Sequence, residues 1–91
     1  MQLLSKKVEI VNELGLHARA AACLVKLTEK FSCDIKIKKD GLEVNGKSIM
    51  GLMMLAAQRG SFIEISANGK DADEALDAIE NLVMERFGEE K

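Results

Sequence analysis

Three segments of the chain alternate apolar and polar residues, which is the pattern of β-strands that bury one face. They cover residues 5–12, 32–39 and 62–67. Asp40-Gly41 is a strong hairpin signal, and residues 42–44 alternate again as the returning strand. The pattern therefore predicts four strands, with inward positions at Val8, Ile10, Cys33, Ile35, Ile37, Ile63 and Ile65.

Two longer segments repeat apolar residues every three or four positions, as amphipathic helices do. The first covers residues 18–31, and its apolar face holds Ala20, Leu24, Leu27 and Phe31. The second covers residues 71–87, where Asp71 and Glu74 resemble a capping box and Gly88 suits the end of the helix. Both segments are predicted to cover the sheet.

A shorter apolar run within residues 46–60 is predicted to form a short helix. Ser48 is its expected N-cap, because a serine oxygen there accepts a hydrogen bond from a first-turn N–H. Met50, Met53 and Met54 follow within this run. A short surface helix buries one side, so these methionines form either an adaptable contact surface or part of the core.

The predicted order is β-α-β-β-α-β-α. Four strands with one buried face, covered by two long helices, make a two-layer α+β sandwich. The 91 residues are enough for one core, and no repeat or linker interrupts them. We therefore expect a single domain over residues 1–91.

Composition then narrows the classes of function. A net charge of −2 argues against a general nucleic-acid binder, which needs a basic surface. No run reaches membrane-spanning length, and residues 1–7 lack the apolar core of a signal peptide. Cys23 and Cys33 are accordingly interpreted as reduced thiols in a cytoplasmic protein.

The candidate chemistry centres on His17, the only histidine of the chain. It falls at or just before the predicted start of the first helix, where unpaired N–H groups and the helix dipole favour an anion. Arg19 adds a charge with a donor geometry suited to phosphate oxygens. An imidazole there could carry a phosphoryl group, whereas the simpler alternative is a histidine that caps or packs the helix end.

Three other chemistries are less well supported. Residues 41–48 match G-x-x-x-x-G-K-[ST], which is a phosphate-binding motif. That motif needs an open loop between its two glycines, but residues 42–44 alternate like a strand. One histidine and two cysteines are too few for a closed zinc site, so no metal is expected. A serine or cysteine nucleophile served by His17 lacks an identifiable orienting acid.

Lys26 lies with Arg19 and Lys30 on the polar face of the first predicted helix. Such a row of cations is either a solvated face or a docking stripe for an acidic partner. The alignment of the row with His17 is the reason to consider a docking stripe beside a solvated face.

Together these residues resemble the HPr family, the histidine phosphocarriers of the bacterial phosphoenolpyruvate-dependent phosphotransferase system. Two motifs carry the resemblance, Gly-Leu-His-Ala-Arg at residues 15–19 and Lys-Ser-Ile-Met-Gly-Leu-Met at residues 47–53. Length and element order agree over essentially the whole chain. The resemblance implies an open-faced β-sandwich with an antiparallel sheet ordered 1-4-2-3.

The resemblance also implies the roles of particular residues. His17 accepts phosphate on Nδ1 from phosphorylated enzyme I and passes it to IIA-type domains, with Arg19 as the flanking arginine. Ser48 is the position modified by HPr kinase in organisms that have that enzyme. The docking surface implied for these partners comprises Arg19, Lys26, Ile49, Met50 and Met53. A cytoplasmic monomer that needs no cofactor is expected.

One residue departs from the family pattern. Ala20 stands directly after Arg19, where the family commonly has proline, and proline there presets φ and removes an N–H. This departure bears on the kinetics of transfer. It also leaves open an alternative function, a mainly regulatory binding module in a nitrogen-related branch of the system.

Overall fold

The computed structural model describes residues 3–91 of the chain. Met1 and Gln2 lie outside the described residues. They belong to residues 1–7, which are interpreted above as lacking the apolar core of a signal peptide. In chain order the elements are β1 (Leu3–Glu9), α1 (Ala18–Thr28), β2 (Asp34–Lys39), β3 (Leu42–Asn45), α2 (Ile49–Met54), β4 (Phe62–Asn68), α3 (Ala72–Met84) and a 3₁₀ turn, η1 (Arg86–Gly88). The predicted order β-α-β-β-α-β-α is confirmed.

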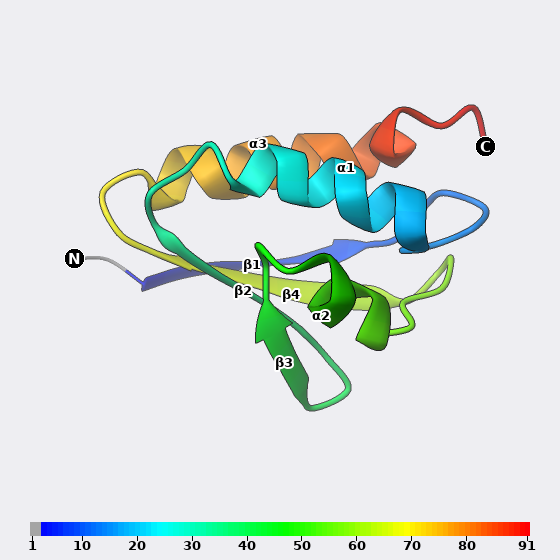
Figure 1. Ribbon diagram of the computed structural model, residues 1–91, viewed down its shortest axis with the longest axis horizontal. Coiled ribbons are helices and arrows are strands. Elements are labelled where there is room, and N and C mark those ends of the chain that lie inside the picture. The colour runs from blue at the N-terminus through cyan, green and yellow to red at the C-terminus, as the bar shows by residue number, and fades with distance from the viewer. Residues whose placement is uncertain (1–2) are drawn as a thin grey trace.

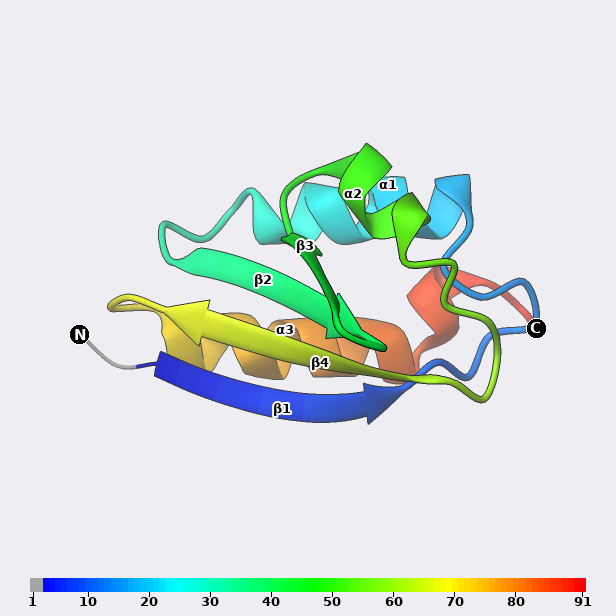
Figure 2. The ribbon, with the colours of Figure 1, turned by 90° about the horizontal axis from the view of Figure 1, so that it is seen from below.

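The four strands form one antiparallel sheet in the order β1-β4-β2-β3. The register places Val8 opposite Ile63 and Ile37 opposite Ile65, so apolar residues of neighbouring strands meet on the same face. Figure 2 shows β4 lying between β1 and β2. This is the sheet that the family resemblance implied.

The helices α1 and α3 lie on one face of the sheet, and the opposite face is open (Figure 1). The residues predicted to face inward are buried. Ile10 and Cys33 lie just outside the strands, however, because β1 ends at Glu9 and β2 begins at Asp34, inside the predicted bounds. The short helix α2 packs beside α1 and β3 at the edge of this layer. The fully buried side chains of the core include Ile10, Leu24, Ile35, Ile37, Leu52, Ile63, Ile65 and Ile79.

Both long helices end earlier than their periodicity predicts. The first ends at Thr28, whose hydroxyl donates to the Gly46 carbonyl at 2.9 Å and ties the helix end to the loop before α2. The other long helix, α3, ends at Met84, and the next residues turn the chain back through positive φ angles of 58° at Arg86 and 55° at Phe87. This turn buries Phe87 against the core and sends the C-terminal residues toward α1.

The capping box predicted at Asp71 is wrong. Asp71 occupies the N-cap position of α3, but its side chain makes no capping hydrogen bond there. Its carboxylate instead accepts hydrogen bonds from the backbone N–H groups of Ser32 at 2.8 Å and Cys33 at 3.0 Å. Asp71 therefore joins the start of α3 to the segment that enters β2.

This contact predicts a pH-dependent contribution to stability. The hydrogen bond from the Ser32 backbone is the main cause that lowers the pKa of Asp71. The ionised carboxylate therefore stabilises the fold above its unfolded pKa of about 3.9, and that stabilisation is lost as the pH falls through the lower folded value. Asp71→Asn is expected to lower Tm by a few degrees at pH 7 and by less at about pH 3.

Thermal melting at both pH values tests this expectation, with Asp34→Asn as the control because Asp34 is an exposed acid on the nearby strand β2. An equal loss of Tm at both pH values would contradict the electrostatic explanation.

Candidate functional site

The backbone before α1 is shaped to present His17. Gly15 has a φ of 68°, and a Cβ atom at this position would lie 2.4 Å from the carbonyl oxygen of Ala57. The next N–H, that of Leu16, donates to the same carbonyl at 2.8 Å. Glycine is required because a larger residue would both adopt a strained φ and collide with the backbone. This tight turn places His17 at the N-cap of α1, which is the predicted position.

The first turn of α1 has unpaired donors. The first intrahelical bond runs from the Ala21 N–H to the His17 carbonyl at 2.8 Å, so the N–H groups of Ala18, Arg19 and Ala20 have no intrahelical acceptor. The imidazole makes no capping hydrogen bond to them, and no acidic residue lies in this first turn. The helix start therefore provides a partial positive charge that favours an anion beside His17.

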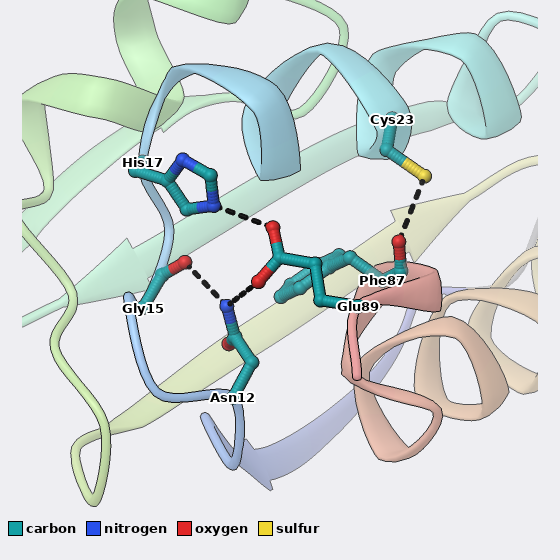
Figure 3. Close-up of polar contacts among 6 residues, drawn as sticks. All are labelled: Asn12, Gly15, His17, Cys23, Phe87 and Glu89. Carbon is teal, nitrogen blue, oxygen red and sulfur yellow. Dashed lines mark hydrogen bonds and ion pairs between the residues drawn. The ribbon is translucent and has the colours of Figure 1, made fainter. Parts of the chain in front are cut away.

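The side chain of His17 contacts a glutamate that was not singled out in the sequence. Its Nε2 atom lies 2.5 Å from Oε2 of Glu89. The other carboxylate oxygen, Oε1, accepts a hydrogen bond from Nδ2 of Asn12 at 2.9 Å. Asn12 also donates to the Gly15 carbonyl at 2.8 Å and is fully buried. Figure 3 shows these contacts as a chain from Gly15 through Asn12 and Glu89 to the ring.

The C-terminal residues reach this site because of the turn after α3. The Phe87 carbonyl accepts a weak hydrogen bond from the Cys23 thiol at 3.7 Å, and the Lys91 carbonyl accepts one from the Glu13 N–H at 2.9 Å. Figure 1 places the C-terminal end beside the loop that joins β1 to α1. The contact between His17 and Glu89 spans 72 positions of the sequence, and no local pattern signals it.

The electrostatics of the site keep Glu89 ionised. Burial of the Glu89 carboxyl acts to raise its pKa, but hydrogen bonds from Asn12 and His17, together with the charges of His17 and Arg19, outweigh this and lower the pKa. A carboxylate therefore faces the ring at neutral pH. The exposed side chain of Arg19 lines the same open cleft as His17 and Glu89.

Of the residues expected to form a docking surface, Arg19 and Met53 each line a pocket together with His17. Ile49 lines another pocket together with Arg19 and Lys26. Met50 is 76% exposed, Met53 44% and Ile49 40%. The alternative in which the methionines fill the core is therefore wrong. Leu14 and Met54, at 69% and 66%, are also exposed.

Ser48 is the N-cap of α2, as predicted. Its Oγ atom accepts a hydrogen bond from the Gly51 N–H at 3.1 Å, and its carbonyl accepts one from the Leu52 N–H at 3.0 Å. The side chain is partly exposed and directly precedes the exposed residues Ile49 and Met50. A change of charge at Ser48 would thus occur at the edge of the apolar surface.

The phosphate-loop alternative does not fit the structure. Residues 42–45 are strand β3, and the Lys47 ammonium donates to the Phe31 carbonyl at 2.7 Å instead of facing an open loop.

Within residues 3–91, no group of three or more His, Cys, Asp and Glu side chains is placed to hold a metal ion. Cys23 and Cys33 are free thiols, and burial raises the pKa of Cys33 to about 11. In the same described part of the chain, every helix is too short or too polar to span a bilayer.

A family model, known relatives and solved structures each match most or all of this chain. A family model described as "PTS HPr component phosphorylation site" matches residues 4–85. The phosphocarrier protein HPr of Cupriavidus necator is 46% identical over 87 residues, which cover 96% of this chain and 98% of the relative. Among solved structures, HPr-C-His from Thermoanaerobacter tengcongensis has a TM-score of 0.89 and 44% identity over 100% of both chains. HPr from Bacillus anthracis has a TM-score of 0.85 and 46% identity over 89% of this chain and 96% of that one.

Proposed function

We propose that His17 is the residue that carries the phosphoryl group. The premise is that this chain belongs to the HPr family of phosphocarrier proteins of the phosphotransferase system. The observation that supports this role most directly is the position of the ring at the start of α1. The imidazole stands beside unpaired N–H groups and in the same cleft as Arg19. These are the groups that a phosphoryl anion needs nearby.

The strength of these interactions suits a carrier. An anion at a helix N-terminus gains on the order of 0.3–2 kcal/mol from the dipole and the first-turn N–H groups. Arg19 is exposed, so its contribution is screened by solvent. A phosphoryl group on His17 is thus stabilised enough to be formed, and it is not bound so tightly that transfer to the next protein becomes slow.

The proposed route begins at phosphorylated enzyme I and ends at IIA-type domains. The exposed apolar residues around His17 offer both partners a common contact surface, and Arg19 and Lys26 favour partners with acidic surfaces. An intact imidazole beside Arg19 supports a carrier over a purely regulatory binding module. The monomeric state and the cytoplasmic location stay predictions.

Ser48 is proposed as a regulatory phosphorylation site for HPr kinase. Its partly exposed hydroxyl caps α2 at the edge of the apolar surface. A phosphate there would place negative charge next to Ile49 and Met50, which are proposed to contact enzyme I. Modification of Ser48 would then reduce docking without any change in His17 itself.

The role of Lys26 is testable through salt dependence. Lys26→Glu is expected to slow phosphoryl uptake from enzyme I severalfold at low ionic strength, because steering by charge acts mainly on the association rate. The defect should shrink at high salt, where surface charges are screened. Initial uptake rates over a salt series provide the measurement.

Lys70→Glu is the matched control for this experiment. Lys70 is also exposed, and it belongs to the loop that joins β4 to α3. Figure 1 shows this loop at the end of the molecule opposite the C-terminal residues. A defect that is the same for both variants, or one that salt leaves unchanged, would contradict the docking role of Lys26.

The proposed function is tested by incubating the protein with phosphoenolpyruvate and enzyme I, followed by mass spectrometry of the intact chain. We expect a mass increase of one phosphoryl group, and we expect it to disappear when a IIA-type domain is added. Peptide mapping should place the group on His17. An unchanged mass with active enzyme I, or a modification at another residue, would contradict the proposal.

A further inference from the structure

We propose that Glu89, held in place by Asn12, is a positioning residue that keeps the proton of the neutral His17 ring on Nε2 and leaves the lone pair of Nδ1 free to accept phosphorus. This inference rests on the proposed function of His17 and deepens it. Glu89 lies beyond residues 4–85, the part of the chain that the family model matches.

The first step of the argument is the hydrogen bond at Nε2. A carboxylate has no proton to donate, so the ring nitrogen that faces it must carry the hydrogen. Nε2 faces Oε2 of Glu89 at 2.5 Å. A neutral imidazole carries one N–H, and the other nitrogen is then unprotonated. Glu89 thus selects the tautomer with a free lone pair on Nδ1, which has no hydrogen bond marked in Figure 3.

The second step is the orientation of the carboxylate. Nδ2 of the fully buried Asn12 donates to Oε1 of Glu89 and to the Gly15 carbonyl. With Oε1 engaged by Asn12, Oε2 is the oxygen that remains for the ring. The side chain of Glu89 is itself 15% exposed, so water competes weakly for this contact. Asn12, which donates to a carbonyl of the turn before α1, therefore also holds the acceptor of the His17 proton.

The third step is the balance of the transfer reaction. The Nδ1 lone pair forms a bond to phosphorus, the bond between phosphorus and the donor group breaks, and its electron pair leaves with the donor. Nε2 keeps its proton throughout, so the phosphorylated ring carries a positive charge that the Glu89 carboxylate stabilises. No other proton has to move. A ring protonated on Nδ1 would first have to lose that proton.

The experiment uses Glu89→Gln, which changes the ring contact with little change in size. Because the donor of Asn12 faces Oε1, the amide oxygen of the glutamine takes that place, and its NH₂ group points at Nε2 of His17. This donor pairs with an unprotonated Nε2 and favours the tautomer with the proton on Nδ1. Glu89→Ala removes the preference without reversing it. Glu90→Gln is the control, since Glu90 is exposed.

The tautomer can be measured directly because the chain has one histidine. Two-bond ¹H–¹⁵N correlation spectra at about pH 9, where a histidine ring is neutral, should show Nε2–H in the parent and in Glu90→Gln. They should show mainly Nδ1–H in Glu89→Gln and a mixture in Glu89→Ala. Thermal melting and backbone spectra verify that each variant is folded.

Phosphoryl uptake should follow the tautomer. We expect single-turnover transfer to slow at least about tenfold in Glu89→Gln, by the precedent of a catalytic histidine held in the wrong tautomer, and to slow less in Glu89→Ala. An unchanged tautomer or an unchanged rate in folded Glu89→Gln would overturn the positioning role while leaving His17 as the carrier. If the parent protein accepts no phosphoryl group, the proposed function fails and the transfer part of this inference fails with it.

Discussion

His17→Ala is expected to abolish phosphoryl uptake from phosphoenolpyruvate and enzyme I. The chain contains no second imidazole, so no other side chain can form the same phosphoramidate. The cation Arg19 and the unpaired N–H groups of α1 remain in this variant, but they only stabilise an anion and provide no nucleophile. In the parent protein, a labelled phosphoryl group on His17 should be lost in acid and retained in base, which is the behaviour of a phosphoramidate.

Loss of uptake in His17→Ala should not result from unfolding. The ring is partly exposed at the start of α1 and is not part of the buried core. We therefore expect Tm to change by only a few degrees. The measurement is label incorporation by both proteins under identical conditions, beside thermal melting of each. Persistent incorporation into folded His17→Ala would show that the phosphoryl acceptor has been misassigned.

Much of the fold could be predicted because the strands alternate cleanly. One face of each strand is buried, so residues such as Val8, Ile37 and Ile63 had to lie under the helices once their alternation was recognised. The N-cap at Ser48 was predictable for a similar reason, since it depends on residues only three positions apart. These features are local, and local patterns describe them well.

The missing half of the site is not local. Glu89 reaches His17 only because Arg86 and Phe87 adopt positive φ angles, which non-glycine residues seldom do. Neither residue type signals such a turn, and the helical periodicity continues through Phe87. The misassigned role of Asp71 has the same origin, because its partners Ser32 and Cys33 lie 39 and 38 positions away.

The exposed methionines show where packing decides between two interpretations of one pattern. The apolar run around Met50 and Met53 fits a core helix and a contact helix equally well. In the structure α2 lies at the edge of the helical layer, so Leu52 is buried while the methionines are exposed. Only the position of α2 against α1 and β3 could separate the two interpretations.

Because the surface around Met50 and Met53 is exposed, Ser48→Asp is expected to have the second large effect on phosphoryl transfer. We expect this variant to reduce phosphoryl transfer from enzyme I at least about tenfold, which corresponds to about 1.4 kcal/mol in the transfer barrier. A partner that covers Ile49 and Met50 must desolvate the new carboxylate. A partner acidic enough to attract Arg19 and Lys26 must also repel it.

Stability should respond to the same substitution in a different way. Aspartate is as good an N-cap as serine, and its oxygen can accept the hydrogen bond that Ser48 now accepts from the Gly51 N–H. Tm should therefore stay within a few degrees of the parent. Ser48→Asn is the matched control, because asparagine keeps the cap and nearly the size of aspartate but has no charge. Thermal melting and initial transfer rates of the three proteins separate docking from folding. If Ser48→Asp transfers as fast as Ser48→Asn, the surface around Ile49 and Met50 does not bind enzyme I.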